Sequence, residues 1–349
     1  MAAQEGTLAE RRASVLKAIV THYVTSGEPV GSKTLVERYQ LGVSPATVRN
    51  EMGALEEAGY IFQPHTSAGR IPTDAGYRYF VDSGLQPLRL PATEARKIQR
   101  FFGEPRYELE DALRQTAALL SGITDHAAVV FAPALERSVV RHVELVPLAG
   151  SRAMVVLVTN TGRVENHIVL VPESVDEVQL DRAAEMLNRL IVDEPLDSAP
   201  EKIASAHENF PLELRDVAHQ VSRALQEDLK HHEAERMFLD GTSNIVHEGK
   251  FADLETVRQV IGALEHRRLL LEVLADALSP DQVSVRIGRE NTLEEMQACT
   301  VVTARYGTDD QPLGSLGVVG PTRMDYRRTI SAVHEVASNL GRMLSSLGI

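Results

Sequence analysis

The sequence contains a single cysteine, Cys299, among its 349 residues. One thiol cannot form an internal disulfide or build a cysteine-rich zinc site, and this scarcity agrees with a reducing compartment. We therefore expect Cys299 to be a small apolar side chain of the core, located on a strand.

Long apolar runs are also missing, because no stretch approaches the roughly 20 apolar residues that a membrane-spanning helix needs. The first six residues have neither the basic segment nor the apolar segment of an export signal. Hydrophobic residues at 43 % and charged residues at 24 % are typical of soluble globular proteins. We expect a cytoplasmic protein without a membrane partner, and the chain is long enough for two or three domains.

Positive charge is in deficit, with a formal net charge of −13, which at first argues against a nucleic-acid partner. The imbalance is uneven: residues 1–83 hold eight Lys and Arg against nine Asp and Glu, whereas the remainder holds 28 against 40. A DNA-binding role would therefore depend on a locally basic face at the N-terminus and on specific contacts.

Catalytic motifs are absent as well. Glycines recur every third residue over 314–320, but they lie in a predicted strand and not at a strand-to-helix turn that could hold a phosphate. His334 and Glu335 begin a zinc-protease pattern, yet Ser338 stands where the second histidine must be. The sequence predicts no enzyme, no cofactor and no metal site.

The N-terminal region has a clear helical pattern. Apolar residues spaced for one helical face predict a first helix over Leu8–Thr25. A break at Gly27–Gly31 follows, and Ser32 is placed to cap a short second helix. Ser44 and Pro45 then form an N-cap with proline at the first helical position, which predicts a third helix over Ala46–Ala58.

The third helix buries Val48, Met52 and Leu55 and turns Thr47, Arg49 and Asn50 outward. Two helices joined by a tight turn suit the DNA major groove, where Arg pairs with guanine and Asn with adenine. The alternative is that these side chains are only a solvated helix face.

A hairpin follows the third helix. Tyr60–Gln63 and Ile71–Pro72 read as its strands, and the turn-forming loop between them would be the wing of a winged helix. Loop residues able to reach phosphates or the minor groove are His65, Thr66, Ser67 and Arg70.

Three runs carry a resemblance to a known family: PVGSKTL from Pro29, SPATVRNEMGALEEAGYI from Ser44, and QPHTSAGRIPTDAGYRYFVD from Gln63. They closely resemble HrcA, a family of bacterial heat-inducible repressors, and SVRIGREN from Ser284 extends the likeness to the C-terminal region. The resemblance implies an inverted-repeat operator upstream of chaperone genes, assistance by the chaperonin GroEL, and a GAF-like body with an inserted dimerisation domain.

We accordingly expect a multidomain α/β protein. The expected parts are a winged helix-turn-helix domain over 1–83, a linker over 84–91, a GAF-like α/β domain over 92–172 and 251–349, and an inserted α+β dimerisation domain over 173–250. Strand-like runs over 127–171, a long helix over Asp253–Ala277, three further strands over 283–319 and a closing helix over Asp325–Leu347 underlie this division.

A single winged helix contacts only a few base pairs, so a useful specificity requires a homodimer on double-stranded, palindromic DNA. We assign base edges to Thr47, Arg49 and Asn50. Phosphates are assigned to Ser32, Lys33 and Ser44, and wing contacts to His65, Thr66 and Arg70. Two other interpretations stay open: a protein-interaction module, and a ligand-dependent sensor or enzyme of GAF type.

Overall fold

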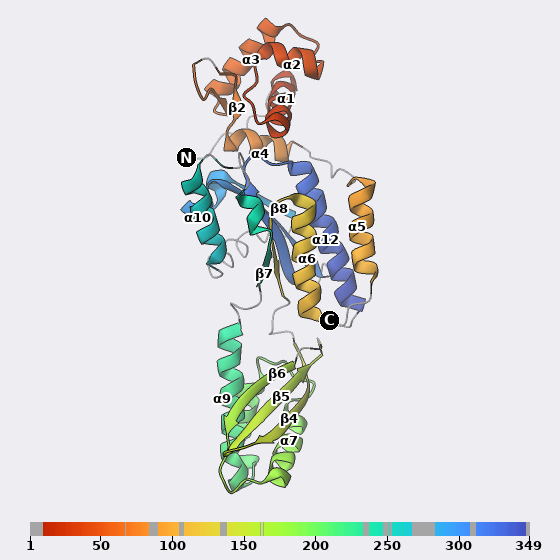
Figure 1. The fold of residues 1–349 in the computed structure, drawn as a ribbon, viewed down its shortest axis with the longest axis vertical. Helices are drawn as coiled ribbons and strands as arrows, with labels where there is room; N and C mark the ends of the chain where they lie inside the picture. The colour runs from red at the N-terminus through yellow and green to blue at the C-terminus, as the bar shows by residue number, and fades with distance from the viewer. Residues whose placement is uncertain are drawn as a thin grey trace.

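The computed structural model describes residues 10–346 except 67, 84–89, 105–107, 133–137, 161, 163, 233–236, 247–250, 252, 267–282 and 308–311. The described residues form three units that follow one another along the long axis of the molecule (Figure 1). We name them the N-terminal unit (10–83), the central unit (90–132 and 237–346) and the inserted unit (138–232). Among the described helices, none is long and apolar enough to cross a membrane.

The N-terminal unit has the predicted order of three helices followed by a hairpin. Its elements are α1 (Glu10–Ser26), α2 (Ser32–Tyr39), α3 (Pro45–Glu57), β1 (Ile61–Phe62), β2 (Ile71–Pro72) and α4 (Asp74–Asp82). Leu16, Ile19 and Leu35 from the first two helices pack with Val48 and Leu55 from the third in one buried core. The backbone of Val30 pairs with that of Arg70 through two hydrogen bonds of 3.1 and 2.9 Å, which adds a third segment beside the hairpin.

The central unit is a five-stranded antiparallel sheet with helices on both faces, in the strand order β7-β3-β10-β9-β8. Its elements are α5 (Ala92–Gly103), α6 (Leu109–Thr124), β3 (Ala127–Phe131), β7 (Met237–Asp240), η4 (Thr242–Ile245), α10 (Leu254–Glu265), β8 (Val283–Ile287), η5 (Gly288–Glu290), η6 (Glu294–Met296), β9 (Cys299–Gly307), β10 (Pro312–Pro321) and α12 (Tyr326–Ser346).

Alternate residues of the strands β3, β7, β9 and β10 enter different cores, as the two-residue period of a strand requires. Val130 belongs to the core shared with α6 and α12, whereas Val129 belongs to the core shared with α10. Cys299 is fully buried at the start of β9, so the expected core role is confirmed. Burial raises the pKa of its thiol to about 12, which keeps the thiol protonated at neutral pH.

The inserted unit has its own sheet and its own core. Its elements are β4 (Val140–Leu148), β5 (Arg152–Thr159), β6 (Val164–Leu170), α7 (Glu177–Ile191), α8 (Ala199–Ser205), η2 (His207–Asn209), η3 (Leu212–Leu214) and α9 (Arg215–His232). The three strands pair antiparallel in chain order, and one sheet face packs on the helices through residues such as Val143, Leu157 and Leu187. The side chain of Asn188 on α7 forms two hydrogen bonds with the edge strand β4. Its Oδ1 accepts from Val143 N at 2.9 Å, and its Nδ2 donates to Val143 O at 2.7 Å.

The structure differs from the expected division of the body. The inserted unit begins before residue 173, the start that the sequence predicts. The strands β4, β5 and β6 pair with one another, share their core with α7–α9 and do not join the central sheet. At the other end, Met237–Asp240 pairs with β3, so this strand belongs to the central unit although it was placed within the insertion. Only the first of the predicted strands over 127–171 belongs to the five-stranded sheet.

Three smaller predictions also need comment. The helix expected over Asp253–Ala277 ends at Glu265, and residues 267–282 lie outside the described residues. The linker expected over 84–91 lies outside them too, apart from Leu90 and Pro91. Ser32 does not cap α2, because Gly31 occupies the N-cap position and Ser32 is the first helical residue.

Candidate DNA-binding surface

The α3 helix begins as its sequence predicts. Ser44 is the N-cap, with its hydroxyl accepting from Thr47 N at 3.2 Å, and Pro45 follows at the first helical position. At the other end Gly59 adopts a φ of +78°, a conformation that costs glycine little. These local signals fix where α3 starts and stops, and therefore which of its side chains face outward.

The two faces of α3 are distinct. Val48, Met52 and Leu55 are buried against the other helices, whereas Arg49 and Asn50 are exposed. Neither exposed side chain forms an ion pair or hydrogen bond with another described residue. Thr47 is half-buried, and its hydroxyl lies 3.0 Å from that of Ser44. A guanidinium and an amide are thus presented to solvent next to the N-terminus of one helix.

Of the two residues of α2 that are predicted to contact phosphates, Lys33 is exposed and Ser32 is buried. The Lys33 side chain is 83 % exposed, and its ammonium lies 3.9 Å from the Glu37 carboxylate on the next turn. Ser32 is only 7 % exposed, which leaves its hydroxyl little surface for a ligand. Lys33 is therefore better placed than Ser32 to meet a phosphate.

The hairpin loop is held closed by the Gln63 side chain and by one hydrogen bond of its own backbone. Gln63 Nε2 donates to Thr66 O at 2.9 Å and to Ala68 O at 2.8 Å, and Ala68 N donates to His65 O at 2.8 Å. His65 and Thr66 are exposed at the tip, while Ser67 lies outside the described residues. The loop therefore projects two polar side chains from a closed turn.

Arg70 is not directed outward as the sequence suggested. Its Nε and a terminal guanidinium nitrogen lie 3.0 and 2.9 Å from Glu56 Oε2, and its side chain is only 23 % exposed. The reason is that the backbone pairing with Val30 places Arg70 beside the last turn of α3, within reach of a carboxylate. In this structure Arg70 joins the hairpin to α3, and contact with a phosphate would require it to leave Glu56.

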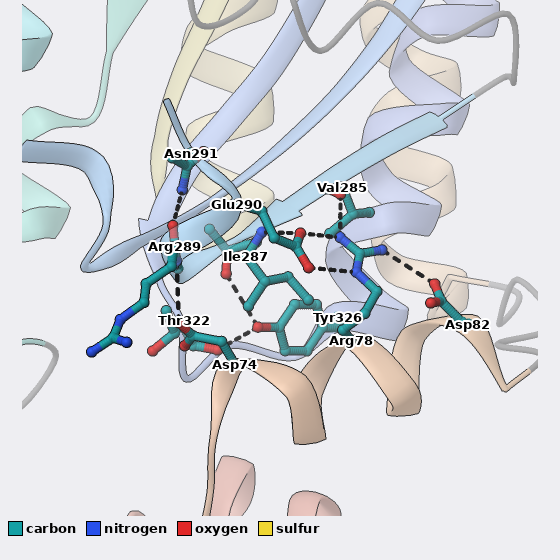
Figure 2. Close-up of polar contacts among 12 residues, drawn as sticks. Asp74, Arg78, Asp82, Val285, Ile287, Arg289, Glu290, Asn291, Thr322 and Tyr326 are labelled. Carbon is teal, nitrogen blue, oxygen red and sulfur yellow. Dashed lines mark hydrogen bonds and ion pairs between the residues drawn. The ribbon is translucent and has the colours of Figure 1, made fainter. Parts of the chain in front are cut away.

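A polar contact between α4 and the central unit was not anticipated from the sequence (Figure 2). Arg78 Nε donates to Glu290 Oε1 at 2.8 Å, and its terminal nitrogens contact Glu290 Oε2, Val285 O at 2.6 Å and Asp82 Oδ1 at 3.2 Å. One turn earlier, Asp74 Oδ2 accepts from Arg289 N at 3.1 Å. We call these side chains and their acceptors the α4 interface.

Apolar packing accompanies these polar contacts. The Tyr77 and Tyr326 rings are 5.5 Å apart, and the Arg327 guanidinium lies 5.7 Å from the Phe80 ring centre. Tyr77 and Phe80 are both buried, so these two aromatic side chains of α4 pack against protein. The available signal was an Arg and two Asp at helical spacing beside these aromatics, but the sequence does not show which distant segment they meet.

Comparisons with known proteins show which family the chain belongs to. The family model described as "HrcA protein C terminal domain" matches residues 110–330. A heat-inducible transcription repressor of Nocardia farcinica is 46 % identical over 337 residues, covering 96 % of this chain and 97 % of the relative. The corresponding repressor of Brevibacillus brevis is 36 % identical, covering 97 % and 98 %. The chain is therefore a transcription repressor and not an enzyme. It belongs to the HrcA family of heat-inducible transcription repressors.

A solved structure supports the fold over the whole length. A crystal structure of a hypothetical protein, determined at 2.2 Å resolution, matches with a TM-score of 0.69 and 23 % identity, covering 98 % of this chain and 100 % of the other. At this identity the likeness concerns the fold, and it agrees with a mixed α/β chain of several units.

Proposed function

We propose that the N-terminal unit is a winged helix that binds an inverted-repeat operator upstream of chaperone genes, as one half of a homodimer. The observation that carries this proposal is the division of α3 into a buried apolar face and an exposed face bearing Arg49 and Asn50. An exposed α3 beside a hairpin is the arrangement that places a helix in the major groove and a loop near the adjoining backbone.

Each exposed group then has a role suited to its chemistry. Arg49 and Asn50 contact base edges, and the Thr47 methyl group lies beside them. Lys33 and Ser44 contact phosphates, which position the helix without selecting a sequence. His65 and Thr66 approach the DNA from the loop. Arg70 takes part only if it exchanges Glu56 for a phosphate.

We infer that a second copy of the chain packs against the exposed face of the sheet β4–β6 in the inserted unit. The face turned away from α7–α9 carries exposed apolar side chains, among them Val164 at 56 %, Ile168 at 64 % and Leu170 at 66 % exposure. Met154 lies opposite Ile168 on one side and Val146 on the other, so the apolar groups form a continuous row across the strands. Contiguous apolar surface of this kind marks protein–protein contacts.

The remaining assignments follow the resemblance to the family. We take the central unit to be the GAF-like domain, an assignment supported by its antiparallel sheet covered by helices on both faces. GroEL would raise the fraction of chain that is competent to bind DNA, by mass action on a loosely stable folded form.

A gel-shift titration on the protein's own chaperone-operon promoter tests the proposal. The purified chain, with and without chaperonin, should shift a duplex carrying the inverted repeat at lower concentration than a scrambled duplex of equal length. A folded dimer that binds both duplexes equally at low salt, even with chaperonin, would contradict it.

The dimer surface has its own test. Ile168→Asp should convert the dimer to monomers in sedimentation velocity, because a carboxylate cannot be buried unpaired in an apolar contact. Val178→Asp is the matched control, since Val178 is also exposed, at 73 %, and lies on α7, which packs on the other face of the sheet. An Ile168→Asp chain that stays dimeric would exclude this sheet face as the interface.

A further inference from the structure

On the central-unit side of the α4 interface, the groups that meet Arg78 are held in place by contacts within the central unit. Asn291 is buried, and its Nδ2, which has two hydrogens to donate, lies 3.0 Å from each of the carbonyl oxygens of Gly288, Met296 and Cys299. Glu290 Oε2 also accepts from Ile287 N at 2.8 Å, which orients the carboxylate independently of α4. The acceptors that meet Arg78 are thus held by the central unit itself.

The contact fixes direction as well as distance. A planar guanidinium bound at both oxygens of one carboxylate defines an orientation that a single point charge does not. Asp74 and Arg78 lie one turn apart on the same face of α4, so the helix is attached at two points along its length. Gly288, with a φ of +56°, lies so close to the Asp74 carboxylate that a Cβ there would overlap it.

The same helix is fixed to the end of α3. Thr73, its N-cap, donates from its hydroxyl to Gly59 O at 2.6 Å and from its backbone to Tyr60 O at 3.0 Å. Gly76 lies against the Tyr60 carbonyl with no room for a side chain. A short series of specific contacts therefore leads from Glu290 through α4 to the residues that follow α3 directly, and Figure 1 shows α4 between the other helices of the N-terminal unit and the central unit.

We propose that the α4 interface sets which separation between operator half-sites the repressor accepts, by fixing the direction of α3 relative to the central unit, which carries the inserted unit and its proposed dimer surface. Arg78 and Asp74 are positioning residues that do not touch DNA. This inference rests on the proposed dimeric DNA binding. Half-sites must recur on one face of the duplex, with about 10 to 10.5 base pairs per turn, so a rigid attachment favours one spacing and a loosened attachment tolerates several.

The experiment is a spacing series measured by fluorescence anisotropy. Inverted-repeat duplexes with the natural spacer, and with spacers changed in single steps up to about half a turn, are titrated beside a duplex with one half-site. For the wild type, we expect affinity to fall at least tenfold at half a turn from the best spacing. For Arg78→Ala, we expect half-site affinity within twofold of wild type and a spacing dependence reduced to threefold or less.

Two further variants keep the test decisive. Glu290→Gln and Asp74→Asn retain side-chain shape and each weaken one attachment, so both should flatten the profile partly. Arg189→Ala is the control, because it removes an exposed ion pair within the inserted unit, that with Glu185 on α7, and should leave the profile unchanged.

The outcomes separate this inference from the proposed function. A variant of the α4 interface that keeps half-site affinity together with the wild-type spacing profile would overturn the positioning role. A wild-type protein that prefers no inverted repeat over a single half-site, at any spacing, would instead overturn the dimeric DNA binding on which the inference rests.

Discussion

Arg78 and Glu290 are 212 positions apart in the chain and form a two-point ion pair between α4 and the central unit. The hydrogen bond to Glu290 is the main cause that raises the pKa of Arg78 further above its ordinary value, so the guanidinium is charged at neutral pH. Since the two side chains are 30 % and 35 % exposed, salt screens the pair in part and its net contribution to stability is about 1 kcal/mol. Its importance therefore lies in orientation.

The roles of Arg49 and Lys33 in DNA binding are distinguishable. Arg49→Ala should weaken operator binding by about 1 to 3 kcal/mol and relax the preference at one base pair of each half-site. Lys33→Ala should weaken binding to all DNA similarly and reduce the slope of log affinity against log salt by about one. Titrations of both variants at several salt concentrations, on the operator and on single-substitution duplexes, check this. Unchanged base preference in Arg49→Ala would show that α3 is placed differently on the DNA.

Two glycines of the N-terminal unit should respond oppositely to the same substitution. A Cβ on Gly69 would lie 2.5 Å from the Val30 backbone, so Gly69→Ala should cost about 1 to 3 kcal/mol of unfolding free energy. Gly53 lies inside α3 with open space around it, so Gly53→Ala should stabilise by about 0.5 to 1 kcal/mol. Urea unfolding followed by circular dichroism measures both changes, and equal effects would contradict the close contact between Gly69 and the Val30 backbone.

Two packed tyrosines at the α4 interface should differ when their hydroxyls are removed. Among the described residues, no partner satisfies the buried Tyr77 hydroxyl, whereas the Tyr326 hydroxyl donates to Thr322 O at 2.6 Å and lies 3.1 Å from the Thr300 hydroxyl. An unsatisfied buried hydroxyl costs free energy. Thermal unfolding should therefore show Tyr77→Phe as stable as wild type or more so, and Tyr326→Phe about 1 kcal/mol less stable. The reverse order would contradict this account.

His22 should make the N-terminal unit sensitive to acid. Burial, and next the nearby Arg38, lower the pKa of this imidazole below 6.5, while Glu28 opposes the shift. The unfolded chain then binds a proton that the folded chain does not, so stability falls as the pH drops through 6.5 and recovers above it. Urea midpoints at pH 7.5 and 5.5 should differ more for wild type than for His22→Gln. The control is His65→Gln, at an exposed site, and identical pH dependence of His22→Gln and wild type would disprove the assignment.

Local patterns predicted the elements well and their partners less well. Ser44 and Pro45 determine the start of α3 through contacts within four residues, so the sequence alone located the helix and its outward side chains. The course of the chain into the insertion was missed for a physical reason. The strand β3 is apolar throughout, whereas β4 mixes apolar and charged residues. Such a difference indicates how many faces of a strand are buried, and only pairing between distant segments, such as β3 with β7, shows that the two strands belong to different sheets.

Side-chain partners depend on the same distant pairings. Arg70 carries the right charge for a phosphate, but the bridge to Val30 places it beside Glu56, which no spacing in the sequence indicates. Ser32 has the residue type of a cap, yet the chain enters α2 one residue earlier, at Gly31. For Arg78, the sequence shows only a charged residue near aromatic residues. Its acceptor, Glu290, follows the inserted unit in the sequence, 212 positions away.

Cleavage of operator DNA from a reagent attached to α3 tests the central claim most directly. Cys299 is buried and its thiol has a pKa raised to about 12, so a cysteine introduced at the exposed position Ala46 would carry an iron-chelate label selectively. The account predicts two clusters of strand cleavage, placed symmetrically within the inverted repeat. A label at Val178 on the inserted unit should produce neither. Uniform cleavage from Ala46→Cys, or a pattern like that from Val178→Cys, would show that α3 does not lie in the operator groove.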